Sequence, residues 1–136
     1  MVRVIMGEKG TGKTKKLIEM INAAAAQEAG NVVCIEAEKT MTFDIHYHVR
    51  LIVAGEYPIG SYESMRGFIS GLYAGNYDIS HIFIDNLLAI VGGKSDHECE
   101  VFLDWLENFS SNHGVRFTVA MSEDPAHATD GMQKYL

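Results

Sequence analysis

Short apolar segments alternate with amphipathic segments along most of this chain, and this alternation limits its possible folds more than any other feature. Residues 2–6, VRVIM, and 32–37, VVCIEA, are apolar and β-branched, as expected of buried strands. The segments that start at 81, HIFID, and at 115, VRFTVAM, have the same character. Strands that alternate with helices form parallel sheets covered on both faces. The sequence therefore predicts an α/β fold with three layers, α/β/α, around a small and mostly parallel sheet.

The segments between these strands have the apolar spacing and the end signals of helices. We expect a helix from about 13 to 27, a second that Ser61 caps and that runs to about 75, and a third that begins at Ser95 and ends before Gly114. Each lies between two expected strands, as crossover connections in a parallel sheet require.

Two other segments carry weaker patterns. Residues 42–53, TFDIHYHVRLIV, alternate apolar and polar side chains, which is typical of a strand with one exposed face. His46 and His48 share a face of that expected strand, so they could bind a metal together, although solvated edge histidines are the commoner cause of such spacing. In GFISG, Gly67 and Gly71 indicate close packing of the second helix on the sheet.

Length and composition limit the partners of this chain. Its 136 residues make one ordinary domain, so we expect a single domain over 1–136. A formal net charge of −7 argues against broad contact with nucleic acid, which needs a cationic surface. The two cysteines, Cys34 and Cys99, make no disulfide framework, and no segment is long and apolar enough to span a membrane. We therefore expect a cytoplasmic protein without a nucleic-acid or membrane partner.

Residues 7–14, GEKGTGKT, follow the first expected strand, precede the first expected helix and match G-x-x-x-x-G-K-[ST] in full. Glycines allow backbone angles that are closed to other residues, so successive N–H groups and the positive helix end can meet phosphate oxygens. Lys13 supplies a flexible charge for the β- and γ-phosphates, and the Thr14 hydroxyl can ligate Mg²⁺. We expect nucleotide binding by Gly7, Glu8, Lys9, Gly10, Thr11, Gly12, Lys13 and Thr14.

The second landmark is Asp85, which ends the apolar segment HIFID. A carboxylate at the end of a buried strand is costly unless it is paired or binds a cation. A phosphate-binding loop of this kind also needs a distant carboxylate that holds magnesium through water. We therefore expect Thr14 and Asp85 to form the metal site. The next residue, Asn86, cannot take a proton, so any general base has to come from elsewhere.

With both landmarks in place, residues 2–122 resemble the P-loop NTPase superfamily and, within it, the recombinase-type (RecA-like) ATPase core. The resemblance implies a domain that binds ATP and Mg²⁺. It implies that Glu38, in VVCIEAEKT, polarises the attacking water and acts in catalysis with Lys13, with Glu36 as the reserve candidate. It also implies a polar γ-phosphate sensor after the last strand, where Ser122 lies.

The chain departs from several related families. The further strands and DNA-binding loops of recombinases are not recognisable, so we do not expect DNA pairing. The chain also resembles small bacterial ATP-binding proteins that are often labelled twitching-motility ATPases, but it lacks the acidic and histidine boxes of true motility ATPases. It lacks the N-K-x-D motif of GTPases, the LSGGQ-like loop of ABC ATPases and the arginine-rich lid of small-molecule kinases. A thymidine-kinase-like core would need a lasso or zinc segment, which two distant cysteines cannot build.

Three functions stay open at this point. The first is a slow, Mg²⁺-dependent ATPase, whose hydrolysis could need an arginine from a protein partner or from a second copy in a homo-oligomer. The second is a nucleotide-binding module that hydrolyses little and signals the ATP state to a partner. The third is a domain with a vestigial loop, which the complete motif disfavours. No residue in the sequence clearly indicates recognition of the adenine base.

Overall fold

The computed structural model describes residues 1–8, 10–39, 44–93 and 95–136 and contains a five-stranded sheet whose strands are all parallel. The strand order across the sheet is β1-β5-β4-β2-β3. The strands are β1 (Val2–Met6), β2 (Asn31–Glu36), β3 (Arg50–Val53), β4 (Ile79–Asp85) and β5 (Arg116–Met121). The predicted α/β fold with a small parallel sheet is confirmed.

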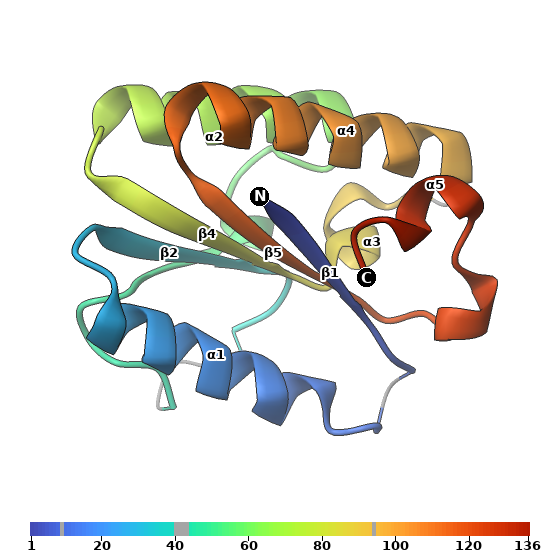
Figure 1. The fold of residues 1–136 in the computed structure, drawn as a ribbon, viewed down its shortest axis with the longest axis horizontal. Coiled ribbons are helices and arrows are strands. Elements are labelled where there is room, and N and C mark those ends of the chain that lie inside the picture. The colour runs from blue at the N-terminus through green and yellow to red at the C-terminus, as the bar shows by residue number, and fades with distance from the viewer. Residues whose placement is uncertain (9, 40–43, 94) are drawn as a thin grey trace.

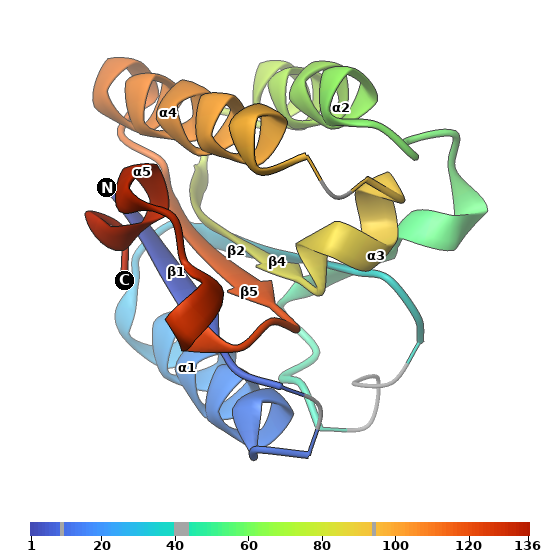
Figure 2. The same ribbon diagram turned by 90° about the vertical axis from the view of Figure 1, so that its right-hand side faces the viewer.

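Helices cover both faces of this sheet (Figure 1). The helix α1 (Lys13–Gln27) lies on one face, and α2 (Tyr62–Gly75) and α4 (Asp96–His113) lie side by side on the other. The short helix α3 (Leu87–Val91) follows β4, and α5 (Asp130–Gln133) lies beside β1 (Figure 2). Two single 3₁₀ turns complete the described elements, η1 (Ala54–Glu56) and η2 (Pro125–His127).

The core has two halves because successive side chains of a strand point to opposite faces of the sheet. In β4, Phe83 belongs to the half that α1 covers, where Leu17 and Ile21 are fully buried. Its neighbours Ile82 and Ile84 belong to the half that α2 and α4 cover. All three β4 side chains are fully buried, which explains why this segment reads as a continuous apolar run.

The predicted helix ends are confirmed at α2 and α4. The Ser61 hydroxyl accepts a hydrogen bond of 3.0 Å from the backbone N–H of Ser64, and the Ser95 hydroxyl accepts one of 3.3 Å from Glu98. Gly114 ends α4 in the left-handed conformation with φ 72°. These caps satisfy N–H groups that the first turn of a helix leaves without a partner.

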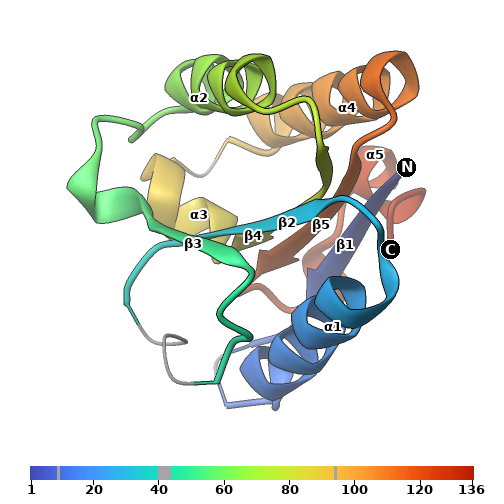
Figure 3. The same ribbon diagram turned by 90° about the vertical axis from the view of Figure 1, so that its left-hand side faces the viewer.

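The strand predicted within 42–53 is confirmed only over its last four residues, Arg50–Val53. Residues 44–49 form turns and bends, and β3 begins only at Arg50, at the edge of the sheet (Figure 3); residues 42 and 43 lie outside the described residues. The cause is Asn22 of α1, whose side chain donates to the Asp44 carbonyl and accepts from the His46 N–H, both at 2.8 Å. These bonds use backbone groups that a strand would pair with its neighbour.

The prediction of close packing at Gly67 and Gly71 is also wrong. Both glycines are exposed, and an added Cβ would meet nothing within 4 Å at either position. The buried positions Met65 and Ile69 lie two residues away, on the opposite side of α2. In the described part of the chain, no helix is long and apolar enough to cross a membrane.

Candidate functional site

One cavity lies where the carboxyl ends of β1, β2, β4 and β5 come together, the end of the sheet that faces the viewer in Figure 2. Its volume is about 500 Å³. It is lined by Glu8, Gly10, Gly12, Lys13, Thr14, Ala37, Glu38, Asp85, Asn86 and Ser122. The structure thus brings together residues that the sequence predicts for phosphate, metal and catalysis. Lys9, which was predicted beside them, lies outside the described residues.

The glycine-rich loop has the backbone conformation that its sequence predicts. Gly10 and Gly12 adopt φ values of 90° and 81°, in the left-handed region that other residues rarely occupy. A Cβ at Gly7 would lie 2.7 Å from the Thr11 hydroxyl oxygen, so the third glycine permits a close approach inside the loop. The Thr11 hydroxyl donates to the carbonyl of Glu8 at 2.7 Å and holds the turn closed.

The loop leads directly into the first turn of α1. Gly12 occupies the position before the helix and offers no side chain to cap it, and the first turn holds no acidic residue. The free N–H groups of a helix start carry a partial positive charge. Because Gly12, Lys13 and Thr14 line the cavity, this helix end gives that part of the cavity a partial positive charge.

Lys13 is joined to the far side of the cavity. Its Nζ donates a hydrogen bond of 2.8 Å to the Ser122 hydroxyl. The bond is possible because β1 and β5 are neighbours and Met6 is in register with Met121, so the residues that follow the two strands meet. The loop lysine and the predicted phosphate sensor therefore lie within reach of one bound group.

Asp85 lies half-buried at the end of β4, in register with Glu36 of β2. Burial raises the pKa of the Asp85 carboxyl, and the Glu36 carboxylate raises it further, while Lys13 and the backbone N–H of Asn86 oppose this shift. A carboxylate in such surroundings gains most from a nearby cation. Thr14, whose hydroxyl can be a second ligand, lines the same cavity.

The structure separates the two candidate bases. Glu38 is exposed and lines the cavity, whereas Glu36 is fully buried and does not. A general base has to lie within hydrogen-bond reach of the proton it takes, directly or through one water. Of the two glutamates, Glu38 therefore meets the positional requirement.

Asn86 lines the cavity in a conformation that sequence reasoning missed. Its φ and ψ are 56° and 57°, and among the described residues it is the one non-glycine with positive φ. Asparagine tolerates this region better than most residues. A signal existed in the sequence, because an asparagine directly before the apolar helix LLAIV is a common way to turn the chain. Ala37, also unpredicted, lines the cavity beside Glu38.

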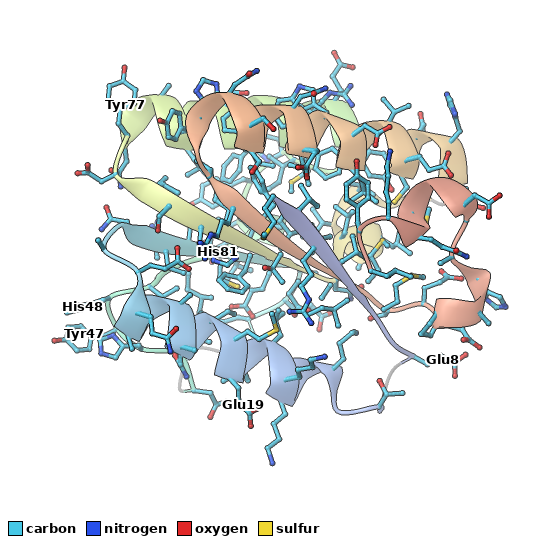
Figure 4. The ribbon with its side chains drawn as sticks, viewed as in Figure 1. Glu8, Glu19, Tyr47, His48, Tyr77 and His81 are labelled. Carbon is cyan, nitrogen blue, oxygen red and sulfur yellow. The ribbon has the colours of Figure 1, made fainter. Side chains whose placement is uncertain are left out.

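The histidine pair lies elsewhere. His46 and His48 are exposed in the turn before β3, with ring centroids 4.8 Å apart and Tyr47 against both (Figure 4). The described residues contain no group of three or more His, Cys, Asp or Glu side chains placed to hold a metal. The pair therefore gains no third ligand of these types from that part of the chain.

No protein-family profile matches the chain, and no curated protein resembles it at a significant level.

Proposed function

We propose that this protein is a RecA-like P-loop domain that binds ATP with Mg²⁺ and hydrolyses it slowly. The observation that carries the proposal is one cavity lined by Gly10 and Gly12 of the glycine loop together with Lys13, Thr14, Glu38, Asp85 and Ser122. Gly7 and Thr11 line a neighbouring cavity. These residues come from segments up to 114 positions apart, from Glu8 to Ser122, yet they lie at one end of the sheet. Parallel α/β sheets bind ligands at the carboxyl ends of their strands.

The cavity suits a chain of phosphates. The loop supplies positive-φ glycines and an uncapped helix start, and Lys13 supplies a mobile cation. When a phosphate oxygen takes the place of the Ser122 hydroxyl as the acceptor for Lys13, a neutral hydrogen-bond acceptor is exchanged for a charged one, which forms the stronger bond. In a protein of formal net charge −7, this concentration of donors is best explained by an anionic ligand.

The cavity also suits magnesium. Mg²⁺ binds oxygen, keeps several waters, and is held by one or two protein ligands together with substrate phosphates. The Thr14 hydroxyl and the Asp85 carboxylate are two such ligands in one cavity. When bound there, the ion would neutralise charge on the β- and γ-phosphates.

Hydrolysis needs a group that orients or deprotonates water, and Glu38 is an exposed carboxylate that lines the cavity. Glu8, the other exposed carboxylate there, belongs to the glycine loop. A positioned base contributes about 10²- to 10⁴-fold to the rate. The described residues that line the cavity include no arginine to stabilise the transition-state charge. Turnover is therefore slow unless a partner or a second copy supplies one.

One observation favours a second function, a nucleotide-binding module that does not hydrolyse. Asn86 follows Asp85 directly and lines the cavity, and its amide cannot accept a proton. If Glu38 does not reach the attacking water, the domain holds ATP without turning it over and reports its presence to a partner.

Isothermal titration with ATP, GTP and ADP, with and without Mg²⁺, tests the proposal. We expect ATP to bind more tightly with Mg²⁺, and Asp85→Asn to remove most of that gain while binding without metal changes little. Asp78→Asn, an exposed aspartate near the start of β4, is the matched control. Equal losses with and without Mg²⁺ would make Asp85 a structural residue, and absence of any nucleotide binding would overturn the proposal.

A further inference from the structure

A second cavity of about 370 Å³ adjoins the first and shares Ser122 with it. It opens at the same end of the sheet, between the ends of β1 and β5, the start of α4 and the C-terminal segment. Its lining residues are Met6, Leu88, Ser95, Asp96, Cys99, Met121, Ser122, Glu123, His127 and Met132. Nothing in the proposed function uses this cavity, although its size is that of a small-molecule site.

The C-terminal segment forms one wall of this cavity and is held firmly in place. The backbone N–H of Val4 donates to the Tyr135 carbonyl at 2.7 Å, which ties the segment to the outer edge of β1. The Tyr135 hydroxyl donates to Asp104 of α4, and the Thr129 hydroxyl donates to Glu100 of the same helix. The wall that carries His127 and Met132 is therefore part of the fold.

The floor of the cavity is apolar and rich in sulfur. Cys99, Met121 and Met132 are buried, and the Cys99 thiol lies 3.8 Å from the sulfur of Met121. Met6 and Leu88, each partly exposed, complete the apolar lining. Methionine side chains are unbranched and polarizable, so such a floor adapts to ligands of different shape.

The rim of the cavity carries negative charge. Asp96, in the first turn of α4, is exposed, and Glu123 lies 3.3 Å from the exposed His127. The lining residues, all within the described part of the chain, include no lysine or arginine. Burial raises the pKa of the Cys99 thiol, Tyr62 opposes this shift, and the Asp96 and Glu100 carboxylates raise the pKa further.

We propose that this cavity binds a small organic ammonium ion, with its charged group at the Asp96 and Glu123 carboxylates and its apolar chain on the methionine floor. Opposite charge favours the ammonium, since N⁺–H···O⁻ hydrogen bonds are stronger than neutral ones. An anionic ligand of the same size would be repelled by the same carboxylates. Buried apolar surface holds the chain of the ligand. This site is distinct from the nucleotide cavity, because Lys13 and the described residues of the glycine loop do not line it, although the two cavities share Ser122.

Three probes of equal length test the proposal: hexylamine, hexanol and hexanoate, titrated into the full chain without nucleotide near neutral pH. Methionine methyl signals observed by NMR report where each probe binds. We expect hexylamine to shift the signals of Met6, Met121 and Met132. Hexanol should bind about tenfold more weakly and hexanoate not measurably, because the rim prefers a cation.

Charge variants distinguish the effect of the rim carboxylates on binding from the effect of the net charge of the protein. Asp96→Asn combined with Glu123→Gln should weaken hexylamine binding about tenfold, since two charge-assisted contacts are lost. Asp78→Asn combined with Glu19→Gln removes the same charge far from the cavity; Glu19 points away from the sheet in Figure 4. This control pair should bind hexylamine as the parent does.

Three results would overturn the proposal. Hexanol binding as tightly as hexylamine would show that the rim charge does not matter. An equal loss of hexylamine affinity in the control double variant would show that the effect comes from the net charge of the protein. Hexylamine shifts confined to Met20 or Met65, two described methionines that do not line the cavity, would place the amine elsewhere.

Discussion

Single residues from four strand ends determine the chemistry of the candidate site. Lys13 is its cation, Asp85 is its half-buried carboxylate, and Glu38 is an exposed carboxylate. Burial raises the pKa of the Asp85 carboxyl, and the charge of Lys13 opposes this rise. In the structure Lys13 donates a hydrogen bond to the Ser122 hydroxyl, a neutral acceptor that a phosphate oxygen can replace.

Glu38→Gln should lower phosphate release at saturating ATP by about a hundredfold or more, because it removes the base while keeping size and polarity. ATP affinity should stay within a small factor. Glu36→Gln should do much less to turnover, since Glu36 is fully buried and does not line the cavity. The measurement is steady-state phosphate release by the parent and both variants.

A Glu38→Gln rate equal to the parent rate would make Glu38 a solvated loop acid. If the parent itself shows no turnover above background, alone or concentrated enough to associate, the module that binds without hydrolysis is the correct function.

Local sequence predicts some of these residues better than others. The loop glycines, Lys13 and Thr14 lie within one short motif, so their spacing alone brings them together. The contact of Lys13 with Ser122 depends on β5 pairing with β1, a long-range choice that no local pattern encodes. The positive φ of Asn86 likewise depends on how β4 turns into α3.

Among whole elements, helices are predicted more reliably than edge strands. The ends of α2 and α4 follow from their own caps, Ser61 and Ser95. The late start of β3 instead depends on Asn22, a residue of α1 that binds the backbone of residues 44 and 46. A period-2 pattern cannot reveal a competing partner from a distant helix.

The turn between α1 and β2 provides a test at this scale. A Cβ at Gly30 would lie 2.6 Å from the Asp78 carbonyl and 2.5 Å from the Ser80 Cβ. Gly30→Ala should therefore destabilise the protein by about 1–3 kcal/mol, because backbone atoms have to move. Gly67→Ala, in an exposed helix position with free space, should stabilise it by about 0.5–1 kcal/mol.

Urea denaturation of the parent and the two variants measures both free energies of unfolding. A Gly30→Ala protein as stable as the parent would show that α1 and β2 do not approach β4 as closely as described.

At the scale of the whole molecule, the two ends of the sheet differ in structure. The cavities lie at the carboxyl ends of the strands, whereas His81 lies toward the amino ends, away from Glu8 of the glycine loop (Figure 4). His81 Nδ1 lies 2.7 Å from Glu28 at the end of α1, and its Nε2 lies 2.9 Å from the Thr118 hydroxyl of β5. This largely buried network joins α1, β4 and β5.

The network should make stability depend on pH. Burial lowers the pKa of His81 below its ordinary 6.5, although Glu28 opposes the shift, so the folded protein holds a neutral ring that donates to Glu28. The unfolded chain then takes the proton first, and stability is lost as the pH falls below 6.5. Hydrogen bonds to His81 and Ser80 outweigh burial and lower the pKa of Glu28, which adds a second loss below its ordinary 4.5.

Urea denaturation across this pH range checks the expectation. His81→Gln should flatten the decline that begins near 6.5, whereas His127→Gln, which alters an exposed pair, should leave it unchanged. An equally steep decline in His81→Gln would assign the pH dependence to other groups.

The central claim is that the glycine loop and Lys13 bind a nucleoside triphosphate, and calorimetric titration of Lys13→Ala with MgATP tests it most directly. Lys15→Ala is the matched control, because Lys15 is an exposed lysine of the same helix that does not line the cavity. Circular dichroism should show both variants folded, since Lys13 serves the cavity and not the core. We predict that Lys13→Ala weakens ATP binding by about a hundredfold or more and that Lys15→Ala binds as the parent does. Unchanged ATP affinity in a folded Lys13→Ala protein would contradict the account.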